Sequence, residues 1–449
     1  MAAGATTELR KRSAGSRSKL WTIHAWVGFY AGIVIAALSL TGVAALFKEE
    51  LDRALNPQLF SVAPAAVTVD IAERIEAVRS EHGPEHHSQT FPPLSPTETW
   101  RLRFLLRKRF GFEQIEVFID PYSGRILGER DYTRTLAYFL RQVHVRLYES
   151  VFGRQIVGIA GIALLVSTVT GLLIYGRFMK KQFFAAVRSK NIRVKMADWH
   201  KLIGVATLAF NLMVAITGAW LGLQVYLQPL VLDARPGGFV RAEKPLTAEV
   251  DIATAVDYPA VMAASQRLFP ELVPRFLIPS RDGSRTVGIR GDVPGQAYER
   301  NSFSLTLDKT GLEELHRYDI RAAGFGDKLF YVQEAVHFGD YGGLAMKFVY
   351  SFFGLTSGFL SLAGFVVYLE RTQKRRREAR TILPTSVVVW RWTGAIVGTC
   401  VLLAIMQLNL GPVVPAMLVL LAVYGSLLFF IVRGLYRSVR ARLVPSTNA

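Results

Sequence analysis

Six long apolar stretches constrain this chain more than any other feature of its sequence. They cover about residues 25–47, 155–176, 202–223, 346–369, 387–407 and 414–432. About twenty apolar residues are needed to cross a bilayer as a helix, because hydrocarbon cannot satisfy exposed backbone polar groups. The sequence therefore predicts an α-helical integral membrane protein with six spans.

Lysine and arginine residues gather in segments that predict the orientation of these spans. The chain has 53 Lys and Arg against 35 Asp and Glu. Much of the excess lies in a leader at 1–20, linkers at 177–198 and 371–384, and a tail at 433–449. All four segments fall on one side if every span crosses, and the positive-inside rule makes that side the cytoplasm, with both termini there. The charge is therefore mainly a topology signal, so we expect a lipid bilayer and no nucleic acid as partner.

Two segments on the opposite side of the membrane, 51–143 and 226–336, are expected to fold as small α+β domains. In the first, 67–79 has helical apolar spacing, 114–120 alternates apolar with polar residues, and 121–124 is a turn. The second is expected to have a helix at 248–268, strands at 286–290 and 302–307, and a turn at 308–311. With flanking residues, the spans are expected at 21–47, 144–176, 199–223, 337–369, 385–407 and 414–432.

The two halves of the chain repeat each other around histidines in the first and third spans. His24 is followed by Gly28, Thr41 and Gly42. The same spacing recurs at His200, Gly204, Thr217 and Gly218. At 3.6 residues per turn, each histidine shares one helix face with both of its glycines, which leaves room there for a large flat group or a close helix.

A second repeated pattern starts at histidines before the second and fourth spans. The first copy is His144, Tyr148, Gly161, Gly171 and Tyr175. The second copy is His337, Tyr341, Gly354, Gly364 and Tyr368. Gly171 and Gly364 lie half a turn away from the histidine face, and we assign them to helix packing.

Parallel repeats in a membrane are related by an axis along the membrane normal. The axis pairs His24 with His200 near the inner surface and His144 with His337 near the outer surface. Two imidazoles that face each other can supply both axial ligands of a haem iron. The sequence therefore predicts two bis-His haem b groups, one near each membrane face.

Supporting roles follow from this hypothesis. Gly28, Gly42, Gly204 and Gly218 are expected to admit the macrocycles. Tyr148 and Tyr341 are expected either to contact a haem propionate or to belong to the aromatic belt. A proton pathway competes with the haem hypothesis, but such pathways usually add Asp or Glu within the spans. A transition-metal site near the outer pair also competes, with Glu149, Glu334 and Asp340 nearby.

The remaining histidines and the single cysteine carry weaker signals. His82, His86 and His87 lie in a polar segment where a metal site is an alternative to a solvated loop, and His316 is expected at the surface. Cys400 is the only cysteine, which excludes a disulfide within one chain and a Cys-ligated iron–sulfur cluster.

The entry to the first span, with its Trp21, His24, Gly28, Thr41 and Gly42, resembles the PepSY-associated transmembrane family. The hairpin at 117–128 is similar to the end of a PepSY domain, and 199–204 is similar to the family's third-span entry. The likeness covers about residues 18–378. It implies a bacterial inner-membrane protein linked to iron uptake, and some members of this family are haem-containing ferric-siderophore reductases.

The resemblance implies a function for the four histidines as haem ligands. An electron from a quinol or a separate reductase would pass through the inner and outer haems to a periplasmic ferric siderophore. The alternatives are a haem-free sensor or regulator and a transporter subunit for iron chelates. A basic run at Arg101, Arg103, Arg107, Lys108 and Arg109 is expected either to attract an anionic chelate or to form a solvated face.

The distance between the two pairs strains this scheme. A straight helix from His144 to Tyr175 would be about 47 Å long, which exceeds a bilayer core and places the outer histidines above it. A tilted helix, a bent approach to the membrane, or an intervening aromatic such as Phe210 or Trp220 would shorten the gap between the irons, and the sequence leaves these alternatives open.

Overall fold

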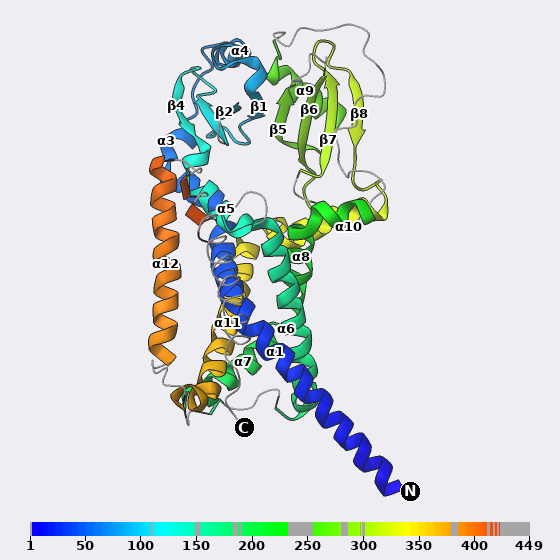
Figure 1. The fold of residues 1–449 in the computed structure, drawn as a ribbon. Coiled ribbons are helices and arrows are strands. Elements are labelled where there is room, and N and C mark those ends of the chain that lie inside the picture. The colour runs from blue at the N-terminus through cyan, green and yellow to red at the C-terminus, as the bar shows by residue number, and fades with distance from the viewer. Residues whose placement is uncertain are drawn as a thin grey trace, which may run out of the picture.

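A computed structural model describes residues 2–108, 111–148, 153–182, 187, 188, 191–231, 255–279, 286–296, 298, 301–378, 385–410, 414, 415, 418, 419 and 422. The chain forms a helical bundle with a β-sheet domain at one end, and the N-terminus lies at the other end (Figure 1). The long helices are α1 (Ala2–Leu46), α6 (Gly153–Gln182), α8 (Leu208–Val231), α11 (Gly343–Glu378) and α12 (Thr385–Leu410). The shorter helices of the bundle are α2 (Lys48–Leu55), α3 (Pro57–Phe60), α5 (Leu136–Arg146), α7 (Ile192–Ala206) and α10 (Phe325–Phe338).

Four of the long helices are the core of the bundle. Each of α1, α6, α8 and α11 contains a stretch that is long and apolar enough to cross a bilayer. These stretches are Lys19–Leu46, Gly153–Tyr175, Leu208–Gln228 and Asp340–Thr372. The two halves of the chain interlock, because α1 packs against α11 and α6 packs against α8. The first four predicted spans are therefore present.

The structure does not establish the last two predicted spans. The fifth corresponds to α12, which lies beside the bundle and contacts α11 and α5 (Figure 1). Among the described residues, only the four helices above have the length and composition of a membrane span, and α12 contributes a shorter apolar stretch, Val401–Leu410. The sixth predicted span, 414–432, lies almost wholly outside the described residues. The six-span topology thus stays a prediction.

The outer histidines stand on short helices that precede the spans. α5 ends before α6 begins, and Leu147 and Tyr148 adopt left-handed backbone with φ of 47° and 65°. α10 ends in the same way at Gly339, with φ of 65°, before a 3-10 turn (Asp340–Gly342) leads into α11. Of the alternatives for residues 144–176, the structure has a bent approach to the membrane, because the chain turns a corner at the outer end of the bundle instead of forming one straight helix from His144 to Tyr175.

The predicted third span is also divided. α7 ends at Ala206 and α8 begins at Leu208, with Thr207 between them. The Thr207 hydroxyl donates to the Ile203 carbonyl, and the side-chain amide of Asn211 donates to Thr207. His200 lies on α7, so a bend separates it from the main part of the span.

The two outer segments form one continuous sheet. The strands are β1 (His87–Phe91), β2 (Trp100–Arg107), β3 (Phe112–Ile119), β4 (Ile126–Asp131), β5 (Val273–Pro279), β6 (Thr286–Asp292), β7 (Phe303–Asp308) and β8 (Glu314–Tyr318). Their order is β4-β3-β2-β1-β5-β6-β7-β8. The halves join where Thr90 of β1 pairs with Leu277 of β5. Two separate α+β domains were expected. In separate domains β1 and β5 would each be an exposed edge strand, and here the two strands pair with each other, which satisfies their backbone N–H and C=O groups.

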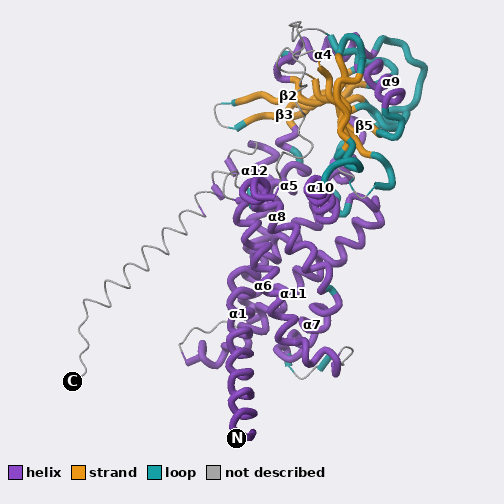
Figure 2. Tube along the Cα trace, turned by 90° about the vertical axis from the view of Figure 1, so that its right-hand side faces the viewer, coloured by secondary structure: helices purple, strands orange, loops and turns teal. Residues whose placement is uncertain are grey.

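One face of this sheet carries the core of the outer domain. Helices α4 (Ile71–His82) and α9 (Tyr258–Leu268) cover it, and Figure 2 shows both beside the strands. Alternate residues of the central strands, such as Leu102, Phe104 and Leu277, are fully buried in this core. α4 starts at Ile71 because the Asp70 carboxylate accepts from the backbone N–H groups at the helix start.

Candidate functional site: two histidine pairs

The inner pair joins the two halves of the chain. His24 of α1 and His200 of α7 have ring centroids 6.1 Å apart, with an angle of 79° between the ring planes. Nδ1 of His24 lies 3.0 Å from the carbonyl oxygen of Ser167, and Nδ1 of His200 lies 2.9 Å from that of Leu360. Each imidazole is thus held by the following span of its own half, α6 or α11.

The outer pair has the same construction at the other end of the bundle. His144 of α5 and His337 of α10 have ring centroids 6.4 Å apart and planes inclined by 30°. Nδ1 of His144 lies 3.0 Å from the Leu38 carbonyl oxygen on α1. Nδ1 of His337 lies 2.8 Å from the hydroxyl of Thr217 on α8. The structure therefore brings the four histidines together as two pairs.

These contacts fix the tautomer of all four imidazoles. A carbonyl oxygen only accepts, so Nδ1 of His24, His144 and His200 must carry the proton. The hydroxyl of Thr217 donates its only proton to the Met213 carbonyl at 2.7 Å, so it too accepts from His337. Each of these four histidines therefore carries its proton on Nδ1 and has its lone pair on Nε2. Histidines that bind metals are usually held in this way, with the non-ligating nitrogen hydrogen-bonded to the protein.

The spacing within each pair fits a metal ion between two imidazoles. A linear imidazole–metal–imidazole unit has two metal–nitrogen bonds of about 2.0–2.1 Å, and each centroid lies about 1.1 Å beyond its nitrogen, which gives about 6.3 Å between centroids. No group of three or more His, Cys, Asp or Glu side chains that could hold a metal occurs in the described residues. A metal at either pair needs further ligands, and a haem macrocycle supplies four.

Four glycines make room for the imidazoles. A Cβ on Gly42 would lie 2.7 Å from His144, and one on Gly218 would lie 3.4 Å from His337. Gly171 and Gly364 face His24 and His200 in the same way, at 3.2 and 3.3 Å. We expected Gly171 and Gly364 to serve helix packing. Each lies instead against an imidazole, because the neighbouring helix, α1 or α7, presents its histidine to the glycine.

The helix-packing role belongs to other members of the repeat. A Cβ on Gly161 would lie 2.6 Å from the backbone of Ala219, and one on Gly354 would lie 2.8 Å from Val43. Gly28 and Gly204 differ from both groups, because a Cβ on Gly28 meets no atom within 4 Å and one on Gly204 meets only Leu360, at 3.7 Å. Gly28 therefore borders open space one turn from His24, whereas Gly204 is in ordinary contact range of Leu360.

The tyrosines of the repeat do not have equivalent surroundings. Tyr148 is 5% exposed and packs with Phe139 and with Leu403 of α12. Tyr341 is 39% exposed, and its hydroxyl lies 3.3 Å from that of Tyr350. Tyr148 and Tyr341 therefore do not share one environment. The predicted contact with a haem propionate and the alternative position in the aromatic belt both stay predictions.

The other histidines serve the sheet domain. His82 is the last residue of α4, and its Nε2 lies 3.1 Å from a Glu129 oxygen. His87 is fully buried at the start of β1, with Nε2 2.9 Å from the Thr90 hydroxyl. The expected polar loop is thus a helix end followed by a strand. His316, expected at the surface, is half-buried on β8.

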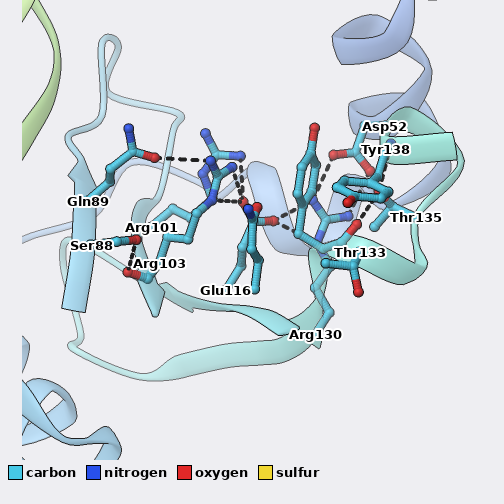
Figure 3. A network of polar contacts seen from close by, with 12 residues as sticks. Asp52, Ser88, Gln89, Arg101, Arg103, Glu116, Arg130, Thr133, Thr135 and Tyr138 are labelled. Carbon is cyan, nitrogen blue, oxygen red and sulfur yellow. Dashed lines mark hydrogen bonds and ion pairs between the residues drawn. The ribbon is translucent and has the colours of Figure 1, made fainter. Parts of the chain in front are cut away.

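The predicted basic run is divided between two environments. Arg101 and Arg103 belong to a buried network with Glu116, Arg130 and Asp52, which Figure 3 shows between β2 and the start of α5. At the far end of β2, Lys108 forms an ion pair with Glu113. A uniformly solvated face was the wrong interpretation, because β2 points its odd-numbered residues toward charged residues of β3, β4 and α2.

Comparison with known proteins places this architecture in a family. Residues 21–371 match the family described as "PepSY-associated TM region". A relative from Pseudomonas aeruginosa, described as an uncharacterized protein, is 26% identical over 252 residues, which cover 52% of this chain and 63% of that protein. The match spans less than two thirds of the relative's length. The family match includes both histidine pairs and the entire sheet, and the chain therefore belongs to the PepSY-associated transmembrane family.

Proposed function

We propose that this protein is a two-haem electron-transfer protein of the bacterial inner membrane that reduces a ferric siderophore, or another Fe(III) chelate, in the periplasm. The observation that carries the proposal is the arrangement of His24, His144, His200 and His337. They form two pairs, in which each imidazole has its Nδ1 proton donated to protein and therefore the lone pair that a metal needs on Nε2.

The chain's own residues have defined parts in this proposal. His24 and His200 hold one haem b, and His144 and His337 hold the other. Such a bis-His haem supplies one-electron chemistry, with both axial positions closed to oxygen. Gly42, Gly171, Gly218 and Gly364 let the imidazoles approach, and Gly28 keeps space open beside the inner pair.

The separation of the pairs suits transfer across the membrane. His24 and the Leu38 carbonyl that holds His144 are fourteen residues apart on α1, which corresponds to about 21 Å along the helix axis. The corner before α6 brings His144 back against α1, and so the two pairs lie much closer than a straight helix would place them.

The direction of transfer follows from charge and coordination chemistry. The positive-inside rule, applied to the basic linkers, supports an inner pair near the cytoplasm, where a quinol or a separate reductase would be the donor. The sheet domain then lies in the periplasm, where the chelate docks. Reduction releases iron because hard oxygen donors suit Fe(III) better than Fe(II).

Proteoliposomes test this function directly. Dithionite is enclosed as the donor, ferric citrate is added outside, and a membrane-impermeant ferrous chelator reports Fe(II) in the outer solution. We expect Fe(II) to form with the parent protein and to fall to the level of empty liposomes in His144→Ala. Equal rates with parent, variant and empty liposomes would reject transmembrane reduction, and a transporter subunit would instead carry labelled chelate into the liposomes without reducing it.

A further inference from the structure

The face of the sheet opposite α4 and α9, called here the open face, carries a cluster of guanidinium groups. Leu102 and Phe104 of β2 point into the core, and so Arg101 and Arg103 lie on the open face. Other elements complete this site: Asp52 comes from α2, Phe60 from α3 and Tyr132 from the turn before α5.

Glu116, which is fully buried on β3, is shared by three arginines. Its Oε1 lies 2.6 Å from Arg103 and 3.3 Å from Arg101, and its Oε2 lies 2.8 Å from Arg130. Arg130 also forms two hydrogen bonds of 2.7 Å with Asp52, and Arg103 also donates to Gln89. Within the described part of the chain, the one ion pair of Arg101 is its longer contact with Glu116, and it is the least satisfied of the three.

Each carboxylate on α2 is paired with another cation, although Glu49 is also attracted electrostatically to Arg101. Glu49 is paired with Lys48, Glu50 with Lys347 and Asp52 with Arg130. With Glu116, these four carboxylates face five cations, namely Lys48, Arg101, Arg103, Arg130 and Lys347. The cluster therefore has one positive charge in excess, and the contact distances place it at Arg101. The Arg101 side chain is 21% exposed, so a ligand can reach it.

Aromatic rings surround this guanidinium. Its central carbon lies 4.0 Å from the centroid of Phe91 and 5.8 Å from that of Phe60. The Phe91 ring lies 5.9 Å from Phe276, across the seam between β1 and β5. Rings on both sides keep the guanidinium in place and reduce its hydration, which strengthens a charge-assisted hydrogen bond to an anion.

We propose that Arg101, flanked by Phe60 and Phe91 on the open face, binds the anionic group of a small ligand. The identity of the ligand rests on the proposed function: it is a ferric chelate with net negative charge. The network of Figure 3 continues from Arg101 through Glu116 and Arg130 to Asp52 of α2, and α2 packs against α5, the helix that carries His144. A chelate bound at Arg101 is thereby held beside the helix of the outer pair.

Binding of a chelate that cannot be reduced tests this site separately from electron transfer. Gallium(III) citrate, an anionic analogue of ferric citrate, is titrated into the detergent-purified full chain by calorimetry. We expect Arg101→Gln to weaken binding about tenfold, since one charge-assisted hydrogen bond is lost. Arg107→Gln is the matched control: Arg107 lies on the same strand and the same face, at its exposed end, and the variant is expected to bind like the parent.

Two further measurements keep the test decisive. Arg101→Lys keeps the charge and is expected to retain most of the affinity, and added salt is expected to weaken binding by the parent. Equal affinity of Arg101→Gln and the parent would overturn the site, as would equal losses in Arg101→Gln and Arg107→Gln. A gallium trihydroxamate without negative charge that binds as tightly as the citrate would also overturn it.

The outcomes separate the site from the function. Gallium is not reduced, so an Arg101-dependent affinity in a protein that holds no haem would support the site and reject the reductase. An Arg101-independent affinity in a protein that reduces ferric citrate would do the reverse.

Discussion

At the residue scale, the two members of the outer pair have different hydrogen-bond acceptors. His144 donates to a backbone carbonyl, as the inner histidines do, whereas His337 donates to the Thr217 hydroxyl. The equivalent Thr41 hydroxyl donates to the Ala37 carbonyl, as Thr217 does to that of Met213, but it lies 3.5 Å from Nδ1 of His144. The symmetry of the repeat is therefore broken at one acceptor.

This difference predicts unequal effects of two matched substitutions. Thr217→Val removes the acceptor of His337, which makes the imidazole a weaker electron donor to iron, and the midpoint potential of one haem is expected to rise by tens of millivolts. Thr41→Val leaves the Leu38 carbonyl in place, and its potential is expected to match that of the parent. Spectroelectrochemical titration of each variant gives the result, and equal shifts in both would contradict the assignment.

The sequence predicted the histidines but not what holds them. Repeated spacing indicated His24 and His200, because a ligand must be a particular side chain at a particular place on a helix face. Their acceptors, the carbonyls of Ser167 and Leu360, were not predictable, since any residue supplies a backbone carbonyl. The contact of Gly171 with His24 likewise depends on how α1 and α6 pack, which helix periodicity does not specify.

At the element scale, periodicity predicted the helices and the strands of the outer domain that alternate clearly. β3 and β7 were expected close to where they lie, and the turns at 121–124 and 308–311 are held by Asp120 and Asp308 side chains that accept from the backbone. A bent approach of α5 and α10 to the spans was one of several alternatives, and the positions of the two corners were not predicted. Gly339 is a turn signal, but Leu147, which adopts a left-handed conformation, is not a residue type that signals a turn.

The joining of the two outer segments into one sheet could not be predicted from the sequence either. Pairing between β1 and β5 joins residues almost two hundred positions apart, and alternation shows only that a strand exists, not which edge it meets. The interpretation of Arg101 and Arg103 as part of a solvated face was wrong for the same reason. Arg101 and Arg103 were adjacent basic residues in the sequence, and Glu116 reaches them only through the β2–β3 register.

The Glu116 network predicts a pH-dependent stability of the sheet domain. Burial raises the pKa of Glu116, but the three guanidiniums outweigh it and lower the pKa from 4.5 to about 2. Because the folded-state pKa is the lower one, ionised Glu116 stabilises the fold above about pH 4.5, and this contribution is lost as the pH falls toward 2. The shift corresponds to on the order of 3 kcal/mol.

Glu116→Gln imitates the protonated carboxyl and tests this contribution. Its unfolding temperature, followed by the circular dichroism of the sheet, is expected to lie well below that of the parent at pH 7 and to approach it at pH 3. Glu129→Gln, at a half-exposed position on β4, serves as the control and is expected to differ little from the parent. A gap for Glu116→Gln that is the same at both pH values would show that its charge is not the stabilising feature.

At the scale of the whole molecule, duplication explains the arrangement. Each half supplies one histidine to each pair, so neither pair exists within one half alone. The same duplication joins the halves again in the outer sheet through β1 and β5. The fold thus sets one histidine pair toward each end of the bundle, with a single continuous sheet beyond the outer pair.

The visible spectrum of the detergent-purified chain and of its histidine variants tests the central assignment most directly. We expect sharp α and β bands on dithionite reduction and two haems per chain. We expect one haem in His24→Ala or His200→Ala, because the outer pair is left intact, and two in His86→Ala, an exposed control. A colourless parent protein would contradict the account, as would the loss of both haems, or of neither, in His24→Ala.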